Sequence, residues 1–364
     1  MPKVSVVIPN YNHARFLRRR IESVLRQTYT DFEVILLDDC STDESRSILA
    51  DYANDSRIVR IEFNEVNSGT TFRQWNKGVR LARGEYVWIA ESDDYADERL
   101  LEKLVPLLDA EPNMVLAYCK SWRVREDGQI NGTSPHQDEK RWTADFRADG
   151  REECRDYLIR GCTIPNASAV LFRREVFVRV GGADESMVLC GDWKLWMAVA
   201  LTGSIAYLAE PFNYHRFHDA SVRQRSQRLG VGPLEHLQVI RWILERVTPS
   251  GPVRQKLSED AFSLWTTTLD VLAQSKPEVA LKVIDEFLRL SGSRSVRRST
   301  LANVWLTVAG IHYRQGRPGR AMVSAGRAVL VRPIVAGRSV KRVLTRLARA
   351  FKNRPSMRRD FEQN

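Results

Sequence analysis

Clustered carboxylates follow an apolar, strand-like run near residue 90. The run 86–90 ends at Glu91-Ser92-Asp93-Asp94. In open α/β folds, ligands bind beyond the carboxyl ends of the strands. Carboxylates there suit Mg²⁺ or Mn²⁺, and such a cation suits a diphosphate. A solvated acidic turn is the simpler interpretation of this segment alone, but other segments indicate the same chemistry.

The turn after the first apolar run carries groups that suit a nucleobase. Pro9-Asn10-Tyr11-Asn12 follows residues 4–8. The ring of Tyr11 offers a surface for a base, and the two asparagines offer amide donors and acceptors. An ordinary strand-to-helix turn, with Asn12 capping the next helix, is the simpler interpretation of this segment when it is taken alone.

Two aspartates end the next apolar run. Asp38 and Asp39 follow residues 34–37. A carboxylate at this position can accept from the ring N–H of uracil or thymine, or from ribose hydroxyls. Helix capping is the alternative, but Ser41 as N-cap with Glu44 already predicts a capping box. The two aspartates are therefore surplus to capping.

Two later segments add a candidate base and a candidate phosphate or metal contact. Asp192 opens an apolar, helix-like segment, where it fits an N-cap or a general base. Arg216 and His218 follow the last strand-like run. An arginine and a histidine there can grip phosphate or bind a metal, unless they belong to a solvated loop.

Strand-like and helix-like segments alternate through the first half of the chain, which predicts a parallel α/β sheet with helices on both faces. Residues 120–150 are polar and rich in glycine, so we expect a loop region there. The expected strands are residues 4–8, 34–37, 58–63, 86–90, 115–119, 167–172 and 205–208.

From about residue 232 onward the pattern is helical, so we expect a domain over residues 1–222 and a helical C-terminal region over residues 223–364. Residues 291–364 hold 17 Lys and Arg against 2 Asp and Glu, whereas residues 1–290 hold 39 against 43. Residues 340–351 are predicted to form a basic amphipathic helix. Such a helix suits an anionic membrane surface or simply closes the domain.

Composition narrows the classes of protein. No run of eighteen apolar residues predicts a spanning helix, and no secretory signal precedes the first strand. The five cysteines are scattered, which favours a cytoplasmic protein without disulfides or structural zinc. No Gly-rich dinucleotide fingerprint, P-loop or nucleophile elbow is present. The basic tail has few aromatic residues, so we expect no nucleic-acid partner.

Taken together, these segments resemble the family 2 glycosyltransferases, which have the GT-A fold: a Rossmann-like, mixed but mainly parallel sheet that binds nucleotide-diphospho-sugars. The resemblance covers about residues 1–222. The matching stretches are residues 4–12, 27–33, 38–43, 84–86, 91–94, 181–185 and 191–193.

The resemblance implies an inverting transfer of a sugar from a nucleotide-diphosphate donor, with a UDP-sugar favoured, to a hydroxyl of a glycan or lipid-linked acceptor. Mn²⁺ or Mg²⁺ is the implied cofactor. By position, Asp192 is the implied catalytic base. The donor contacts are Pro9, Tyr11, Asp38, Asp39, Arg73, Asn76, Asp93 and Arg216, and the metal ligands are Glu91, Asp93, Asp94 and His218.

Three positions depart from the family pattern. Glu91 stands in the first place of the usual Asp-x-Asp and still supplies a carboxylate. Gly191 replaces the glutamate that often precedes the base. Cys40 replaces the usual glycine after the aspartates, which predicts a turn that needs no positive φ.

The leading hypothesis is a cytoplasmic transferase of surface polysaccharide synthesis, held peripherally at the inner face of the plasma membrane by its basic helix. A protein that binds a nucleotide sugar or a partner on the same fold, without turnover, is the alternative. Metal binding by the carboxylates discriminates between the two.

Overall fold

The computed structural model describes residues 1–134, 140–218 and 231–251, with scattered residues between 253 and 327. The chain divides into two compact units, Met1–Arg228 with Ile243–Pro249, and Leu229–Trp242 with Ser250–Asn364. The predicted boundary after residue 222 and the predicted basic helix over 340–351 lie outside the described residues. Within the described part, none of the helices is long and apolar enough to cross a membrane.

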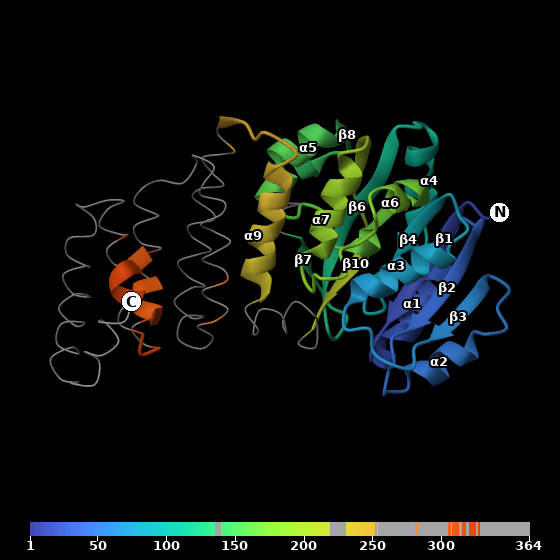
Figure 1. Ribbon diagram of the computed structural model, residues 1–364. Helices are drawn as coiled ribbons and strands as arrows, with labels where there is room; N and C mark the ends of the chain where they lie inside the picture. Colours follow the sequence, from blue (N-terminus) through green and yellow to red (C-terminus); the bar gives the residue numbers. More distant parts are fainter. Residues whose placement is uncertain are drawn as a thin grey trace. The chain divides into compact units, whose positions relative to one another are not determined.

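A ten-stranded sheet forms the first unit (Figure 1). Its main path runs β3-β2-β1-β4-β9-β6-β10-β5, with β7 paired to β6 and β8 paired to β10. The strands are β1 (Val4–Asn10), β2 (Phe32–Asp38), β3 (Ile58–Phe63), β4 (Tyr86–Ile89), β5 (Tyr95–Ala96), β6 (Met114–Arg125), β7 (Ile130–Thr133), β8 (Phe146–Asp149), β9 (Val170–Arg173) and β10 (Ser204–Phe217).

The sheet is mixed. β1 pairs in parallel with β2 and β4, β2 with β3, and β6 with β10, whereas β9 runs antiparallel to both β4 and β6. The predicted mixed sheet of an α/β fold is therefore confirmed, and its central strands β1, β2, β3 and β4 form a parallel set. Two antiparallel steps through β9 return β6 and β10 to the direction of β4, so the carboxyl ends of β1, β2, β4 and β10 meet at one edge.

Helices cover both faces of this sheet. The described helices of the first unit are α1 (Ala14–Leu25), α2 (Ser45–Asp51), α3 (Thr71–Leu81), α4 (Leu100–Asp109), α5 (Gly150–Asp156), α6 (Arg174–Arg179) and α7 (Gly191–Ala200). A further helix, α9 (Val231–Leu244), lies almost wholly in the second unit. Helices α1, α2 and α4 share a core with one face of β1, β2 and β4. Helix α3 packs on the other face, where a Cβ at Gly78 would lie 2.2 Å from Cγ1 of Val7.

The core explains why the central strand β1 is apolar on both sides. All seven residues of β1 are buried. Val6 faces the cluster that holds Leu17 and Ile21 of α1, whereas Val7 faces α3. A strand covered by helices on both faces is apolar almost throughout, which is why residues 4–8 are nearly all apolar. The exception, Ser5, is buried, and its hydroxyl donates to Glu33 Oε1 at 2.7 Å.

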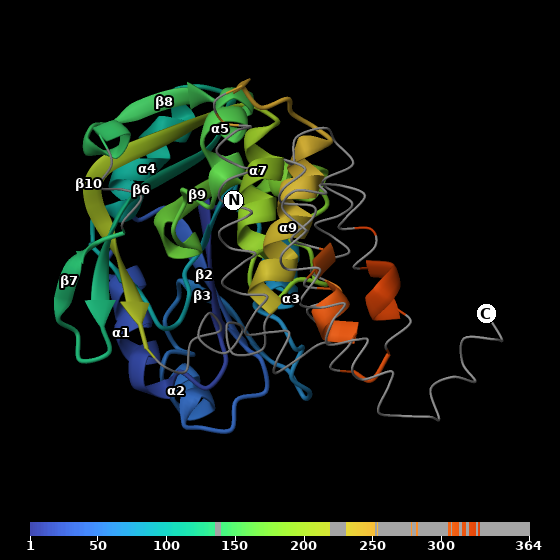
Figure 2. The same ribbon diagram turned by 90° about the vertical axis from the view of Figure 1, so that its left-hand side faces the viewer.

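Residues 120–150, expected as a loop region, contain the end of β6 and the whole of β7 and β8, so that expectation was wrong. β6 continues to Arg125 and stays paired with β10 through Phe217. Figure 2 shows β6, β7 and β10 side by side at the rim of the unit. The backbone ladder stabilises these strands even though many of their side chains are polar, and a hydrophobic pattern cannot reveal such a strand.

The predicted capping box at Ser41 was also wrong. Helix α2 begins at Ser45, and its N-cap residue, Glu44, makes no side-chain capping bond. The Ser41 hydroxyl instead accepts from the amide N–H of Asn12 at 2.9 Å and from Asn10 Nδ2 at 3.2 Å. Ser41 therefore ties the turn after β2 to the turn after β1.

Candidate active site

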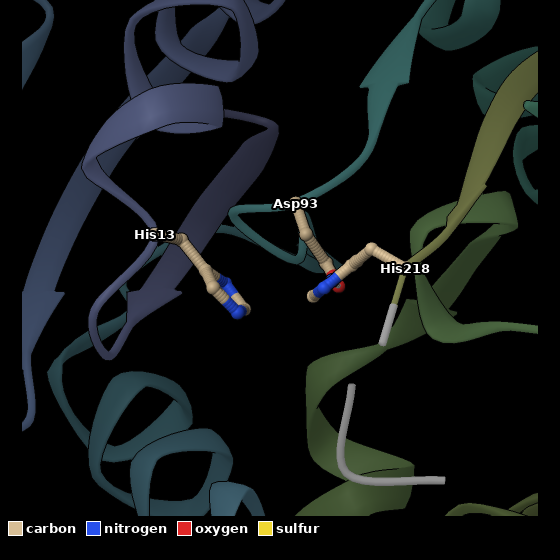
Figure 3. Close-up of side chains that lie close together, drawn as sticks. All are labelled: His13, Asp93 and His218. Atoms are coloured by element: carbon tan, nitrogen blue, oxygen red, sulfur yellow. Dashed lines mark hydrogen bonds and ion pairs between the residues drawn. The ribbon is translucent and has the colours of Figure 1, made fainter. Parts of the chain in front are cut away.

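Three side chains from distant segments converge at the carboxyl edge of the sheet (Figure 3). His13 precedes α1, Asp93 follows β4, and His218 follows β10. One ligand atom from each lies within 4.8 Å of the others. The Nε2 atom of His218 lies 3.0 Å from Oδ2 of Asp93. Two imidazoles and one carboxylate at this spacing can hold a divalent cation.

The surroundings keep this cluster in a ligand-competent form. Burial works against ionisation of Asp93, but the His218 hydrogen bond and the neighbouring imidazoles outweigh it and lower the pKa of Asp93. Burial lowers the pKa of His13, which favours the neutral imidazole. The Nδ1 atom of His13 lies 2.8 Å from the Ser92 hydroxyl, which orients the ring. Phe16 packs against His218, with ring centroids 5.2 Å apart.

Asp94, unlike Asp93, is bound by protein groups on both carboxylate oxygens. Its side chain is 2% exposed, and its Oδ1 accepts from the amide N–H of Arg216 at 2.8 Å. Its Oδ2 accepts from Asn166 Nδ2 and lies 3.9 Å from Nη2 of Arg20. The structure therefore places this predicted metal ligand inside a buried polar network, and Asp94 is not a member of the His13–Asp93–His218 cluster.

Glu91, also a predicted metal ligand, is directed toward α3. Its Oε1 accepts from Trp75 Nε1 at 2.6 Å and from the Thr71 hydroxyl at 3.4 Å. Burial and the nearby Asp93 raise the pKa of Glu91 to about 8. The structure thus joins Glu91 to a helix, and it brings only Asp93 and His218 of the four predicted ligands together.

The turn after β2 holds Asp39 tightly. Its Oδ1 accepts from Asn64 Nδ2 at 2.7 Å, from the Ser68 amide at 2.8 Å and from Gln74 Nε2 at 2.9 Å. Its Oδ2 accepts from the Ser68 hydroxyl at 2.7 Å. A carboxylate has about four lone-pair sites, two on each oxygen, so Oδ2 can accept one further hydrogen bond.

Asp38 is fully buried and serves the same turn. Its Oδ2 accepts from Asn10 Nδ2 at 3.1 Å, and its Oδ1 accepts from the Ser41 amide at 3.0 Å and from Arg46 Nε at 3.1 Å. These bonds link the ends of β1 and β2, so Asp38 holds the two turns together.

The expected turn geometry at Cys40 was wrong. Its φ is +64°, in the left-handed region, and Asn12 opposite has a φ of +55°. The amide of Thr42 donates to Asn12 Oδ1 at 2.8 Å, so the two turns interlock.

The predicted base contacts Pro9 and Tyr11 lie at the end of β1. Pro9 is buried inside the strand, whereas Tyr11, just beyond the strand, is 42% exposed. Tyr11 is thus accessible to solvent.

The two predicted donor contacts on α3 both contact the loop before α7. Asn76 is buried, and its Nδ2 donates to the Ala183 carbonyl and to Glu185 Oε1, each at 2.9 Å. The Nε atom of Arg73 lies 3.5 Å from Oε2 of Glu185, and about half of its side chain is exposed. Arg73 is therefore accessible to a ligand, whereas Asn76 shapes the loop.

Asp192 lies in the first turn of α7 and is half-buried, and its Oδ1 accepts from the Trp193 amide at 2.7 Å. The residue before it cannot carry a side chain without a shift of its neighbour. A Cβ at Gly191 would lie 2.5 Å from Cε2 of Phe72. This contact explains why glycine stands where the family often has glutamate.

Arg216 is bound by carbonyl groups of its own chain. Its Nε donates to the Asp93 carbonyl at 2.9 Å, and its Nη1 donates to the carbonyls of Arg125 and Glu126, each at 3.1 Å. The arginine predicted to grip phosphate therefore links β10 to the Asp93 loop and to the β6–β7 turn.

Sequence reasoning missed His13 and Arg20. A single histidine after Asn12 carries no spacing signal, and only the convergence of three segments reveals it. Arg20 did carry a signal in the sequence. It is a charged residue at a position of the helix whose neighbours on the same face, Leu17 and Ile21, are apolar.

Residues 5–181 match the family model of glycosyl transferase family 2. The chain contains a glycosyl transferase family 2 domain. It is 29% identical over 231 residues to an uncharacterized glycosyltransferase of Nostoc sp., an alignment that covers 60% of this chain and 66% of the relative. The alignments cover between 14% and 66% of the length of the first three curated relatives.

Solved structures share the GT-A fold of this domain. A Staphylococcus aureus TarS fragment in complex with UDP-GlcNAc matches with a TM-score of 0.61 at 17% identity, covering 92% of this chain and 90% of that one. A mannosyltransferase from Pyrobaculum calidifontis in complex with GDP-Man and Mn²⁺ matches with a TM-score of 0.52 at 17% identity, covering 90% and 87%. At these identities the likeness establishes the fold alone.

Proposed function

We propose that this glycosyltransferase moves a sugar, with inversion, from a UDP-sugar to a hydroxyl of a glycan or lipid-linked acceptor in surface polysaccharide synthesis. The convergence of His13, Asp93 and His218 beside the turns of Tyr11 and Asp39 carries the proposal. The TarS fragment, a fold neighbour, was solved with UDP-GlcNAc, which supports a UDP-linked donor.

The same three residues fit a divalent cation. Two nitrogen donors and one carboxylate favour Mn²⁺ over Mg²⁺, because Mg²⁺ prefers an all-oxygen shell. When bound, the cation acts as a Lewis acid that neutralises charge on the diphosphate leaving group. The cation would be held by Asp93, His13 and His218. The hydrogen bond between His13 Nδ1 and the Ser92 hydroxyl would orient the His13 ring.

The remaining residues bind the donor and move one proton. Tyr11 offers its exposed ring to the base, and the free lone pair of Asp39 can accept from a base N–H. Arg73 is available to the donor sugar or diphosphate. Asp192 takes the proton of the acceptor hydroxyl as that hydroxyl attacks the anomeric carbon from the face opposite the diphosphate. The bond between the anomeric carbon and the diphosphate oxygen breaks in the same step, and UDP leaves. One displacement of this kind inverts the configuration.

A cytoplasmic location at an anionic membrane surface remains part of this proposal, supported by the charge of residues 291–364 in the sequence. Vesicle sedimentation of the full chain and of a chain lacking residues 338–364 tests it. Loss of binding to anionic vesicles on truncation supports the proposal, and equal binding contradicts it.

Thermal unfolding with added nucleotides tests the donor class. A ligand that binds only the folded state raises the unfolding temperature. We expect UDP to raise it with Mn²⁺ present, and GDP, CDP and dTDP to raise it less. No shift with any nucleotide would contradict the proposal and favour a protein that does not bind donors.

A further inference from the structure

We propose that Arg20 is a positioning residue that holds the loop 91–94 in the shape that presents Asp93 to His13 and His218. The inference rests on the proposed function, because it takes these three residues as the cation ligands. Arg20 contacts neither substrate nor cation in this account and acts through the loop.

Arg20 lies midway along α1, at the end of its second turn. Its side chain is 0% exposed. Its Nε donates to the Glu91 carbonyl at 2.8 Å, and its Nη2 lies 3.9 Å from Oδ2 of Asp94. Its guanidinium carbon lies 5.7 Å from the centroid of the Trp88 ring. One side chain therefore reaches both ends of the four-residue loop.

Core packing alone does not require an arginine at this position. The other inward residues of α1 include Leu17, Ile21 and Val24, all apolar. Burying a guanidinium is costly unless it is paired. The Nη1 and Nη2 atoms make no hydrogen bond to the described protein atoms, so the nearby Asp94 carboxylate supplies the main compensation.

The anchors on either side leave Asp93 free to face the site. The Glu91 amide donates to the Ser168 hydroxyl at 3.0 Å, while its carbonyl accepts from Arg20. Asp94 is held by the Arg216 amide and by Asn166. Removing Arg20 frees the Glu91 carbonyl and leaves the Asp94 charge without its buried counter-charge. Residues that support metal ligands typically change metal affinity by about 10–100-fold when mutated.

The test compares two buried arginines in the full chain. Arg20→Met removes the charge and keeps the length of the side chain. Arg173→Met is the matched control. Arg173 is 8% exposed and donates to the carbonyls of Met114 and Leu108, and it pairs with Tyr86 at the start of β4, away from the site. Mn²⁺ affinity is measured by calorimetry, and stability by thermal unfolding.

We expect both variants to unfold at lower temperature, but only Arg20→Met to lose about 10–100-fold in Mn²⁺ affinity. Arg20→Lys keeps the charge and should recover part of that loss. Wild-type affinity in Arg20→Met, or an equal loss in Arg173→Met, overturns the inference. If Arg20→Met does not fold, Arg20→Lys and Arg20→Gln replace it, and wild-type affinity in both overturns the inference.

The wild-type titration separates this inference from the proposed function. A wild-type chain that binds no Mn²⁺ contradicts the cation site, and with it both proposals. Wild-type binding that is unchanged in Arg20→Met contradicts only the role of Arg20.

Discussion

The Nε2 atom of His218 lies 3.0 Å from Oδ2 of Asp93, although 125 residues separate the two in sequence. The pair exists because β4 and β10 end at the same edge of the sheet. His13, from the end of β1, completes the cluster. The three residues therefore meet because their strands run in the same direction and end at the same edge. No single sequence motif contains all three.

The histidines provide the first prediction. His13→Gln and His218→Gln should each weaken Mn²⁺ binding by at least about tenfold, because each removes one of three ligands. Calorimetry measures the affinity. The control is His312→Gln, in the second compact unit, which should bind Mn²⁺ with wild-type affinity. Unchanged affinity in His13→Gln would remove that residue from the site.

The two neighbouring aspartates should behave differently. Asp94→Asn leaves the Arg20 charge buried without its partner, and breaking such a pair costs about 3–5 kcal/mol of unfolding free energy. Asp93→Asn should cost less stability but abolish Mn²⁺ binding. Urea unfolding and metal titration of both variants test this. Equal losses in both measurements would contradict the division of roles.

Asp192 is predicted to act in chemistry and not in donor binding. Asp192→Asn should fold and bind UDP with Mn²⁺ as wild type does, yet lose about 10²–10⁴-fold in transfer rate, which is the usual worth of a general base. Calorimetry measures the affinity for UDP, and a transfer assay measures the rate of sugar transfer. An Asp192→Asn variant with normal turnover would refute the assignment.

The left-handed backbone at Cys40 predicts an unusual tolerance of glycine. Cys40→Gly should leave stability within about 1 kcal/mol, since glycine adopts positive φ without strain. Cys40→Val should lose about 1–3 kcal/mol, because a β-branched residue is strained there. Thermal unfolding compares them with Cys40→Ser. Equal stability of the glycine and valine variants would contradict the geometry.

Glu33 provides a prediction about pH. Burial opposes its ionisation, but hydrogen bonds from Arg83 and Ser5 outweigh burial and lower the pKa of Glu33. A carboxyl group with a lowered pKa stabilises the fold above its unfolded-state pKa, about 4.3, and this stabilisation is lost as the pH falls through the folded value.

Glu33→Gln removes that titration. The unfolding temperature of the variant should be lower than that of wild type at neutral pH, and the gap should narrow as the solution is acidified. Thermal unfolding across the acid range measures both curves. Parallel curves would show that Glu33 does not contribute in this way.

The sheet edge could be predicted because it depends on a robust pattern. The runs before Tyr11, Asp39 and Asp93 are apolar strands of one parallel set, so their carboxyl ends had to meet. The helical spacing of the apolar residues that follow Asp192 correctly placed it at the start of a helix. The strands within residues 120–150 were not predicted. Backbone hydrogen bonds stabilise them, and their side chains do not form an apolar pattern.

The finer roles depended on geometry that residue types do not encode. Asp93 and Asp94 are chemically identical, and only the direction of each carboxylate separates a cluster member from a buried anchor. Cys40 adopts a positive φ that non-glycine residues rarely adopt. Arg216 was expected to meet phosphate because arginine often does, but carbonyls of its own chain surround it.

Calorimetric titration of UDP into the full chain, with Mn²⁺ and then with EDTA, tests the central claim most directly. The account predicts UDP binding that requires Mn²⁺ and that is lost in Asp93→Asn. UDP binding of equal strength in EDTA, or none under either condition in a folded sample, would contradict a donor site built on His13, Asp93 and His218.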